Sequence, residues 1–286
     1  MKKIIVTGCN GQLGRAIGQQ YAGSTEYELI NTDVGELDIT RVEPVLALAR
    51  EVKPYAIINC AAYTNVDKCE VDVDLAYKIN AIGARNLAIA ASDTGAKLMH
   101  ISTDYVFPGT SPDPLTEFDS PDPISMYGKT KYAGERFVEQ FADKYFMIRT
   151  AWLYGDGHNF ARTMLKLSEK MDTIGVVKDQ YGSPTSALEL AKAVKYLLPT
   201  ENYGLFHGTC EGDTNWAEFA KTVLCLAGKK TEIEPITSEE YKRRFPESAS
   251  RPAYSILENY MLKLTTDFTF ATWQDAIEVY MRELMG

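Results

Sequence analysis

Short apolar segments alternate with amphipathic segments along the first half of the chain. The apolar segments end at glycine or at polar residues, and apolar positions in the segments between them recur at helical spacing. The predicted strands are Lys3–Thr7, Tyr27–Asp33, Tyr55–Cys60, Lys97–Ser102 and Tyr145–Thr150. The predicted helices are Gln12–Tyr21, Arg41–Val52, Asp72–Ser92 and Met126–Phe141. Because strands that are apolar on both faces belong in parallel sheets covered by helices, the pattern predicts an α/β fold with a doubly wound parallel sheet.

The pattern loosens after Trp152, where helices alternate with loops that contain proline and glycine. The predicted helices of this part are Asn159–Lys170, Ser186–Leu197, Thr214–Leu226 and Thr272–Leu284. We therefore expect a smaller, mostly α-helical C-terminal domain that folds against the first. The expected division assigns residues 1–150, joined by 176–205, to the first domain, and residues 151–175 and 206–286 to the second.

The net charge of the chain indicates which kinds of binding partner can be excluded. The chain has 286 residues, of which 30 are Lys or Arg and 39 are Asp or Glu, so the net charge is −9. Nucleic acids and anionic membranes bind clustered positive charge. We therefore expect neither nucleic acid nor a membrane as the main partner.

The cysteines and the apolar runs bear on the compartment. The five cysteines form no C-x-x-C pair, and the three histidines lie far apart, so no zinc pattern is present. The apolar start of the chain ends at Thr7 and Gly8, too early for a signal-peptide core, and no apolar run approaches the roughly 18 residues of a membrane helix. We expect a reduced, cytoplasmic protein without a metal site.

A glycine-rich loop joins the first predicted strand to the first predicted helix. The spacing G-x-x-G-x-x-G allows a tight turn, a close backbone approach to a pyrophosphate, and close packing of helix on sheet. The helix N-terminus offers free N–H groups to the phosphates. We expect the first domain to be a Rossmann-type NAD(P)-binding domain, although three glycines can also form a simple turn. The loop residues expected at the cofactor are Gly8, Asn10, Gly11, Gln12, Leu13 and Gly14.

Two further strand ends extend this prediction. Asp33 follows Gly14 by 19 positions and ends the second strand, where a carboxylate is expected to bind the adenosine ribose. Its charge favours NADH, since it would repel a 2′-phosphate. Cys60 ends the third strand, and Ala61 and Ala62 follow it. Small residues there allow a cofactor to lie against the backbone, although the two alanines are equally compatible with ordinary packing.

A tyrosine and a lysine lie one helical turn apart at the start of the fourth predicted helix. Residues at i and i+4 share a helix face, so Lys131 is expected beside Tyr127 and expected to lower the pKa of its phenol. Such a phenol can donate a proton to a developing alkoxide. Thr103, at the end of the fourth strand, is placed to hydrogen-bond the same oxygen. Taken alone, the Tyr–Lys pair is more often a solvated helix face.

Together these residues resemble the extended short-chain dehydrogenase/reductase family, and the likeness covers the whole chain. The similar stretches are Gly8–Gly14, Asn59–Glu70, Ser102–Phe107, Tyr127–Glu135, Arg149–Tyr154, Asn159–Met164, Asp179–Thr185 and Ser250–Pro252. The resemblance implies catalytic roles for Thr103, Tyr127 and Lys131. It further implies a cofactor site that includes Asp33, Asp38, Ile39 and Asn80, with NADPH or NADH as cofactor.

The stretch S-T-D-Y-V-F bears on the reaction. Sugar-nucleotide dehydratases of the family place Glu where this chain has Tyr105, and a tyrosine cannot replace that carboxylate base. The resemblance therefore implies reduction rather than dehydration. It implies a sugar site lined by Thr64, Val66, Asp104, Tyr105 and Trp152. Arg251 is a candidate for the substrate diphosphate, since arginine binds phosphate in a fork, or for a loop-anchoring salt bridge.

One departure from the family concerns its dimers. Some relatives pair through a magnesium ion held by glutamates, one of them just after the glycine loop, where this chain has Arg15. Glu189 is similar to another of those positions, but one carboxylate is not a site. The chain is compatible with a homodimer, but we do not expect a metal-bridged one.

The leading hypothesis is that NAD(P)H reduces C4 of a 4-keto-6-deoxyhexose attached to dTDP, with Tyr127 as the proton donor. A second hypothesis is a different nucleotide-sugar reductase or an epimerase on the same scaffold. A third is a non-catalytic regulatory subunit of the kind that binds a methionine adenosyltransferase.

Overall fold

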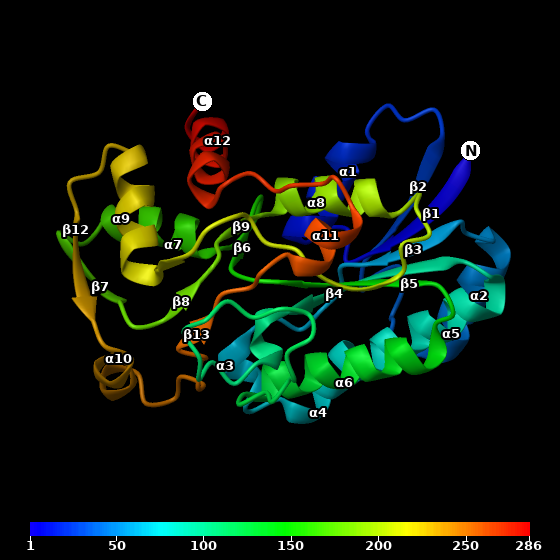
Figure 1. Ribbon diagram of the computed structural model, residues 1–286, viewed down its shortest axis with the longest axis horizontal. Helices are drawn as coiled ribbons and strands as arrows, with labels where there is room; N and C mark the ends of the chain where they lie inside the picture. The colour runs from blue at the N-terminus through cyan, green and yellow to red at the C-terminus, as the bar shows by residue number, and fades with distance from the viewer.

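A six-stranded parallel sheet forms the centre of the computed structural model, which describes residues 1–286 (Figure 1). Its strand order is β10-β5-β4-β3-β1-β2, with all neighbours parallel. The strands are β1 (Lys2–Thr7), β2 (Tyr27–Thr32), β3 (Ala56–Asn59), β4 (Lys97–Thr103), β5 (Tyr145–Thr150) and β10 (Gly204–His207). The order reverses between β1 and β3, and ligands of such sheets bind outside the carboxyl ends of the strands at this point.

Helices cover both faces of this sheet (Figure 1). The helices on one face are α1 (Gln12–Tyr21), α8 (Ala187–Leu197) and the short α11 (Tyr260–Thr265). The helices on the other face are α2 (Val42–Val52), α5 (Ala84–Thr94) and α6 (Met126–Phe141). Successive strand side chains point to opposite faces of the sheet. Ile58 packs against α1 and α8, while Ile57 packs against α2 and α5. The predicted doubly wound α/β fold is confirmed.

The predicted helix Asp72–Ser92 is divided in the structure. α4 (Val73–Tyr77) is followed by a π-helical turn, Lys78–Gly83, and then by α5. A short helix, α3 (Val66–Cys69), precedes α4, and a 3-10 turn, Asp104–Val106, follows β4. The apolar periodicity of this segment did not distinguish a continuous helix from one with an inserted π-turn.

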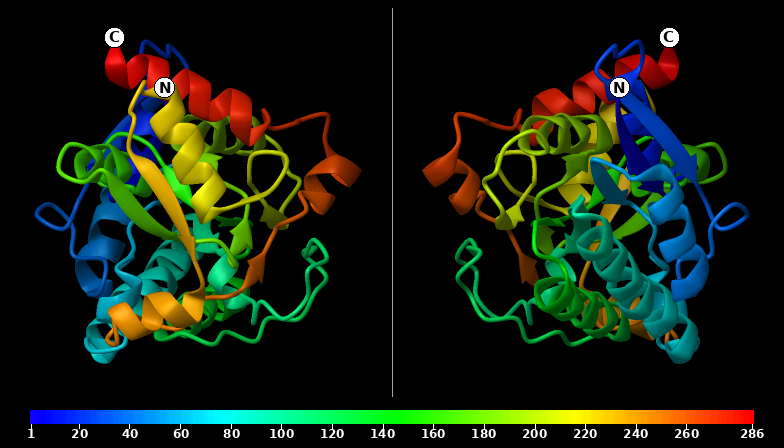
Figure 2. Two further views of the ribbon diagram at one scale, coloured as in Figure 1. Left: turned by 90° about the vertical axis from the view of Figure 1, so that its left-hand side faces the viewer. Right: turned by 90° about the vertical axis from the view of Figure 1, so that its right-hand side faces the viewer.

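The second part of the chain contains short strands that the sequence pattern did not predict. Its helices are α7 (Phe160–Ser168), α9 (Trp216–Leu226), α10 (Ser238–Arg244) and α12 (Trp273–Met285). Its strands are β6 (Leu153–Tyr154), β7 (Thr173–Val177), β8 (Tyr181–Gly182), β9 (Thr185–Ser186), β11 (Thr214–Asn215), β12 (Glu232–Ile236) and β13 (Tyr254–Ser255). Two-residue strands cannot show an alternating pattern. Of the two five-residue strands, β7 contains Gly175 and β12 contains Pro235, and both residue types weaken a strand signal. Figure 2 (left) shows α9 and the parallel β7–β12 pair on this side of the molecule.

The two parts of the chain share one hydrophobic core at α11. Leu262 and Phe270 pack with α1 and α8 on the central sheet, whereas Phe219 and Trp273 belong to a separate core of the second part. We propose the division into residues 1–150 with 176–205, and 151–175 with 206–286, in which α11 returns from the second domain to the first.

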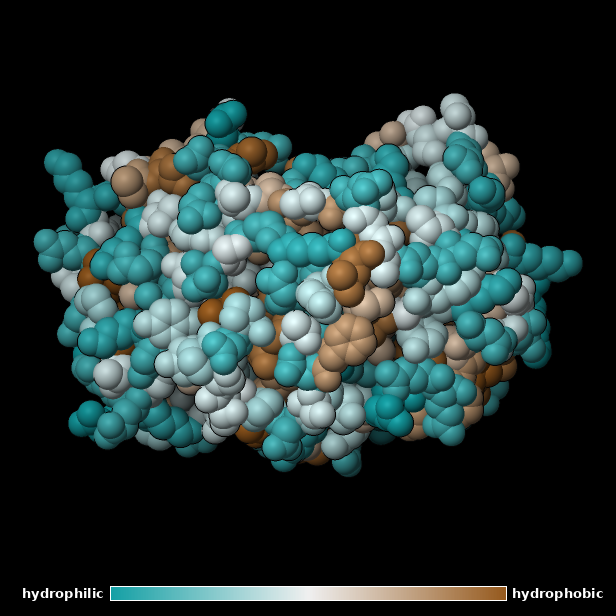
Figure 3. Space-filling model, in the orientation of Figure 1, coloured by the Kyte–Doolittle hydropathy of each residue, from teal (hydrophilic) through white to brown (hydrophobic).

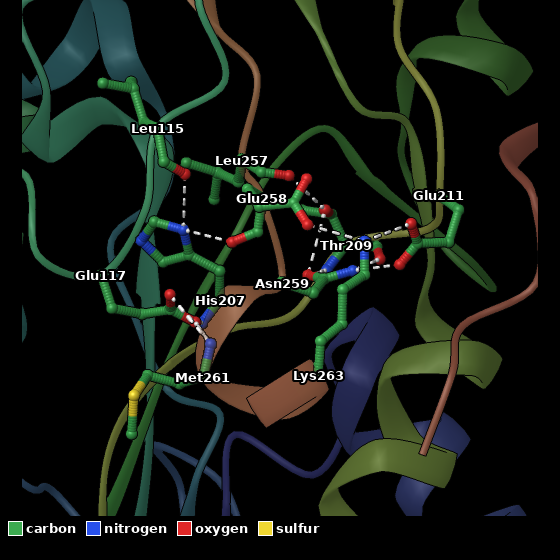
Figure 4. Close-up of polar contacts among 10 residues, drawn as sticks. All are labelled: Leu115, Glu117, His207, Thr209, Glu211, Leu257, Glu258, Asn259, Met261 and Lys263. Carbon is green, nitrogen blue, oxygen red and sulfur yellow. Dashed lines mark hydrogen bonds and ion pairs between the residues drawn. The ribbon is translucent and has the colours of Figure 1, made fainter. Parts of the chain in front are cut away.

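A buried polar network holds α11 on the end of β10 (Figure 4). The Glu117 carboxylate accepts hydrogen bonds from the backbone N–H of His207 (2.7 Å) and of Met261 (3.2 Å). Burial lowers the pKa of His207 to about 3, so its ring is neutral at neutral pH. The Asn259 side chain accepts from the Thr209 N–H and donates to the Thr209 carbonyl. These bonds satisfy backbone groups where the chain crosses from one domain to the other.

The surface is mostly hydrophilic on the face shown in Figure 3, with hydrophobic residues gathered near α11. Phe118 and Leu264 are exposed there, and the Phe118 ring packs edge-on against Tyr260 with centroids 6.2 Å apart. No helix of the structure combines the length and the apolar character needed to cross a bilayer.

A buried ion pair joins α6 to β5 and gives a stability prediction. Arg149 donates to both carboxylate oxygens of Glu135, at 2.9 and 2.7 Å, and both side chains are almost fully buried. Because Glu135→Ala leaves an unpaired buried charge, we expect it to lower the free energy of unfolding by about 3–5 kcal/mol. Urea unfolding checks this. The double variant Glu135→Leu/Arg149→Met should recover part of the loss, and a single variant as stable as the wild type would contradict the prediction.

Candidate active site

The glycine loop lies against the chain that leaves β3. Gly8 has a φ of +65°, and a Cβ at this position would lie 2.7 Å from the Ala61 backbone nitrogen. α1 starts at Gln12 without a side-chain cap, so the first N–H groups of the helix are free to bind an anion. The residues present therefore fit a dinucleotide pyrophosphate. The predicted positions of Gly8, Gly11 and Ala61 come together here.

A buried network fixes the end of β3 beside this loop. The Asn59 side-chain oxygen accepts hydrogen bonds from the Thr7 hydroxyl (2.8 Å) and from the Ala61 N–H (3.1 Å). Cys60 and Cys9 pack against the same hydrophobic core, and burial raises the pKa of the Cys60 thiol to about 12. Cys60 therefore serves as a small apolar group at neutral pH.

The end of β2 is acidic. Asp33 accepts hydrogen bonds from the backbone N–H groups of Asn10 (3.0 Å) and Val34 (2.8 Å), which hold its carboxylate next to the glycine loop. Glu36 lies close to it, since its carboxylate accepts from the Asp33 N–H at 2.9 Å. Burial raises the pKa of Cys9, and the charges of Asp33 and Glu36 add to this shift. Two carboxylates thus border the expected adenosine end of the cofactor site.

Three other residues that the resemblance assigns to the cofactor have internal partners. Asp38 accepts from the Thr40 N–H and hydroxyl, which lower the pKa of its carboxyl group. Ile39 is buried in the core with α2 and α5. The Asn80 amide accepts from the Tyr63 N–H (2.8 Å) and donates to the Tyr63 carbonyl (3.1 Å), so it anchors the chain before α3. The sequence does not reveal these partners because they lie far along the chain or at a turn.

Tyr127 lies in the first turn of α6, at the end of β4. Ser125 caps this helix by accepting from the Gly128 N–H, and the Tyr127 ring packs edge-on against Tyr105 with centroids 5.4 Å apart. The Thr103 hydroxyl donates to Asp104 (3.0 Å) and accepts from the Tyr105 N–H (3.2 Å). The structure thus gathers the strand-end hydroxyl and the helix-start phenol at one edge of the sheet.

The electrostatics of the Tyr–Lys pair differ from the sequence-based prediction. Burial raises the pKa of Tyr127, and the nearby Thr103 hydroxyl offsets part of this shift. Lys131 donates to the Ile101 carbonyl (2.6 Å), and burial lowers the pKa of its ammonium group to about 8. The prediction that Lys131 makes Tyr127 acidic is therefore wrong, because desolvation of the phenol dominates its pKa. Tyr127 holds its proton at neutral pH.

Asp104 is an unusual carboxyl group within this arrangement. It is buried, and one of its oxygens, Oδ2, has no hydrogen-bond partner. Burial raises its pKa to about 6, and the nearby Ser255 and Thr103 hydroxyls offset part of this shift. Its protonation state therefore changes just below neutral pH.

Trp152 lies just after β5 and packs against the second part of the chain. Its φ of +47° is unusual for a residue with a side chain, and such strain costs about 1–3 kcal/mol. The indole stacks on Trp216 with centroids 3.6 Å apart and an interplanar angle of 10°. Sequence reasoning missed Trp216, because it lies on α9 and nothing in its local pattern points to Trp152.

The remaining predicted sugar-site residues lie on or near α3. Thr64 is exposed, and α3 begins at Val66; their roles at the substrate stay predictions. Arg251 approaches from the loop after α10, and its guanidinium pairs with Asp67 at 2.9 Å. The alternative of a loop-anchoring salt bridge is thus realised in this structure.

The positions that bridge a metal in some relatives have other partners here. Arg15 pairs with Asp156 at 2.8 Å, and Glu189 pairs with Lys192. No group of three or more His, Cys, Asp or Glu side chains is arranged to hold a metal ion.

Comparisons with known proteins show which family the chain resembles over its whole length. The family described as "RmlD substrate binding domain" matches residues 1–285. A dTDP-4-dehydrorhamnose reductase of Aggregatibacter actinomycetemcomitans is 35% identical over 287 residues, covering 97% of this chain and 98% of that protein. The spore coat polysaccharide biosynthesis protein SpsK of Bacillus subtilis (strain 168) is 38% identical, with 99% and 98% covered.

Solved structures extend the comparison. A dTDP-4-dehydrorhamnose reductase from Clostridium acetobutylicum has a TM-score of 0.96 and 50% identity, covering 99% of this chain and all of its own. The enzyme of the same name from Bacillus anthracis, in complex with NADP, has a TM-score of 0.93 and 43% identity, with 99% of both chains covered. On this shared fold and sequence, the chain belongs to the RmlD substrate-binding-domain family of extended short-chain dehydrogenases/reductases.

Proposed function

We propose that this chain reduces dTDP-4-dehydrorhamnose to dTDP-L-rhamnose with NADPH or NADH, the last step in making that sugar nucleotide. The observation that carries the proposal is the position of Tyr127 and Thr103 together at the sheet edge next to the glycine loop. The reductases that match the full length of the chain support it. Its free cysteines also support a cytoplasmic location.

The glycine loop and the N-terminus of α1 would hold the pyrophosphate, and Asp33 would face the adenosine ribose. When bound, the nicotinamide supplies the hydride that reduces the C4 carbonyl of the sugar. Ala61 and Gly8 leave room for this ligand along the backbone, because neither carries a side chain larger than a methyl group.

Tyr127 is the proton donor in this proposal. Its raised pKa keeps the phenol protonated until charge develops on the substrate oxygen, to which it then transfers the proton. The Thr103 hydroxyl turns from Asp104 to donate a hydrogen bond to the same oxygen. The Lys131 ammonium stabilises the phenolate that remains.

The geometry also favours reduction over dehydration. The Tyr105 phenol occupies the position of the base of the related dehydratases, and burial raises its pKa, so it is not a base at neutral pH. An epimerase or a regulatory subunit would use the same fold, and NAD(P)H oxidation with the keto sugar separates these alternatives.

The first test removes the proton donor. Tyr127→Phe keeps the ring and its contact with Tyr105, but it deletes the hydroxyl. We expect kcat to fall about a hundredfold or more, because a general acid contributes about that much. The dissociation constant for NADH, measured by fluorescence, should stay the same. Unchanged turnover would refute the acid role.

The second test is the pH profile of the free enzyme. The Lys131 charge is present below its pKa of about 8 and lost above it. Since kcat/KM reports groups of the free enzyme, we expect kcat/KM for the sugar nucleotide to fall as the pH rises through about 8. A profile that stays level up to about pH 10 would show that this charge is not needed.

The third test concerns cofactor choice. Asp33 and Glu36 place two negative charges where NADPH carries its 2′-phosphate, so we expect the wild type to prefer NADH. The variant Asp33→Asn/Glu36→Gln should raise the ratio of kcat/KM for NADPH to that for NADH by about tenfold, which corresponds to about 1.4 kcal/mol. Glu43→Gln, at an exposed acid on α2, is the control. An unchanged ratio in the double variant would contradict the role of these carboxylates.

A further inference from the structure

The short helix α3 and its C-cap residue Glu70 lie between helix α6 and the loop that carries Ala249 and Arg251. The reaction proposed above uses none of the charged residues of this segment. Asn65 caps it by accepting from the Lys68 N–H at 3.0 Å. Cys69 is fully buried and its thiol contacts the Tyr63 carbonyl, so the helix is fixed to the body of the protein. A helix that is packed in this way has little freedom to move, so it can fix the positions of the residues that contact it.

On one side, Asp67 holds the loop that carries Ala249 and Arg251. Its Oδ1 accepts from the Ala249 N–H at 2.8 Å and from the Arg251 guanidinium at 2.9 Å. The Arg251 side chain is 23% exposed and the Asp67 side chain 47% exposed, so the arginine charge is partly desolvated while the carboxylate remains in contact with solvent. The Arg251 charge also acts on the phenol of Tyr105, which packs against Tyr127.

On the other side, Glu70 holds the start of the catalytic helix. Its Oε1 accepts from the Met126 N–H at 2.9 Å, and Met126 immediately precedes Tyr127. This N–H belongs to the first turn of α6 and has no partner within the helix. The Glu70 charge also lies at the positive end of the helix dipole, which favours it there.

We propose that α3, together with its C-cap residue Glu70, positions two sides of the substrate site. Asp67 fixes Arg251 on one side, and Glu70 fixes the first turn of α6, which carries Tyr127, on the other. The inference rests on the proposed function. It assigns no catalytic step to Asp67 or Glu70, since neither touches the reacting atoms.

The role of Asp67 has a direct physical basis. A free arginine loses side-chain entropy when it binds a diphosphate. Arg251 is already held in place by Asp67 and by its own hydrogen bond to the Ala249 carbonyl. Arginine carries several N–H donors, so it can bind a phosphate while it keeps this pairing. Asp67 thus lowers the cost of binding the dTDP part of the substrate.

The first experiment compares Asp67→Asn with Asp74→Asn, a control at an exposed acid on α4. We expect Asp67→Asn to raise KM for the sugar nucleotide about tenfold, with a smaller change in kcat and no change in KM for the cofactor. Titration calorimetry with dTDP alone should show an equal loss of affinity. If Asp67→Asn has the same KM and dTDP affinity as Asp74→Asn, the inference is overturned.

A double-mutant cycle adds a readout that a general structural defect would not produce. The effects of Asp67→Asn and Arg251→Ala on dTDP affinity should be far from additive, since each removes the same pairing. Additive losses would show that Asp67 acts independently of Arg251 and would contradict the assignment.

The second experiment tests Glu70 by rescue. Glu70→Ala removes the acceptor of the Met126 N–H, and we expect kcat to fall about tenfold while KM for the cofactor stays constant. Glu70→Gln keeps an acceptor oxygen and should restore most of the turnover. Equal activity of Glu70→Ala and wild type would overturn this half of the inference.

The failure of the proposed function would look different. In that case the wild type would not oxidise NAD(P)H with dTDP-4-dehydrorhamnose. The dTDP affinities of the wild type and Asp67→Asn would still decide the role of Asp67, because calorimetry needs no turnover.

Discussion

The close approach of α6 to the end of β4 is the constraint on which the rest of the site depends. A Cβ at Gly128 would lie 2.1 Å from the Tyr105 carbonyl oxygen, and a Cβ at Gly134 would lie 2.3 Å from the Asn80 carbonyl oxygen. No side chain fits at either position without movement of the backbone. The two glycines therefore let the helix pack onto its neighbours along its length, and this contact places Tyr127 and Lys131 at the edge of the sheet.

The same packing sets the chemistry of these side chains. Burial raises the pKa of Tyr127, lowers that of Lys131 to about 8 and raises that of Asp104 to about 6. All three shifts favour the neutral form, as desolvation does for acids and bases alike. Tyr127 therefore keeps its proton at neutral pH, while the Lys131 and Asp104 side chains change charge close to neutral pH.

Two joints connect the central sheet and its helices to the second part of the chain around this site. The Trp152–Trp216 stack joins the end of β5 to α9, and the Asp67–Arg251 pair joins α3 to the loop after α10. Each joint unites residues far apart in the sequence. The strained backbone at Trp152 indicates that the surrounding packing holds this side chain in place, since such a conformation persists only where neighbours enforce it.

The sheet and its glycine loop could be predicted from the order of residues, because strand–helix alternation and the spacing from Gly8 to Gly14 are local features of the chain. The same order also placed Thr103 and Tyr127 at one sheet edge, since carboxyl ends of parallel strands meet there. Three features depend on how the chain folds: Asn80 anchors Tyr63, Trp216 supports Trp152, and burial outweighs the Lys131 charge at the Tyr127 phenol. Hydrogen-bond partners and desolvation depend on what packs around a group in space, and no spacing along the chain encodes that.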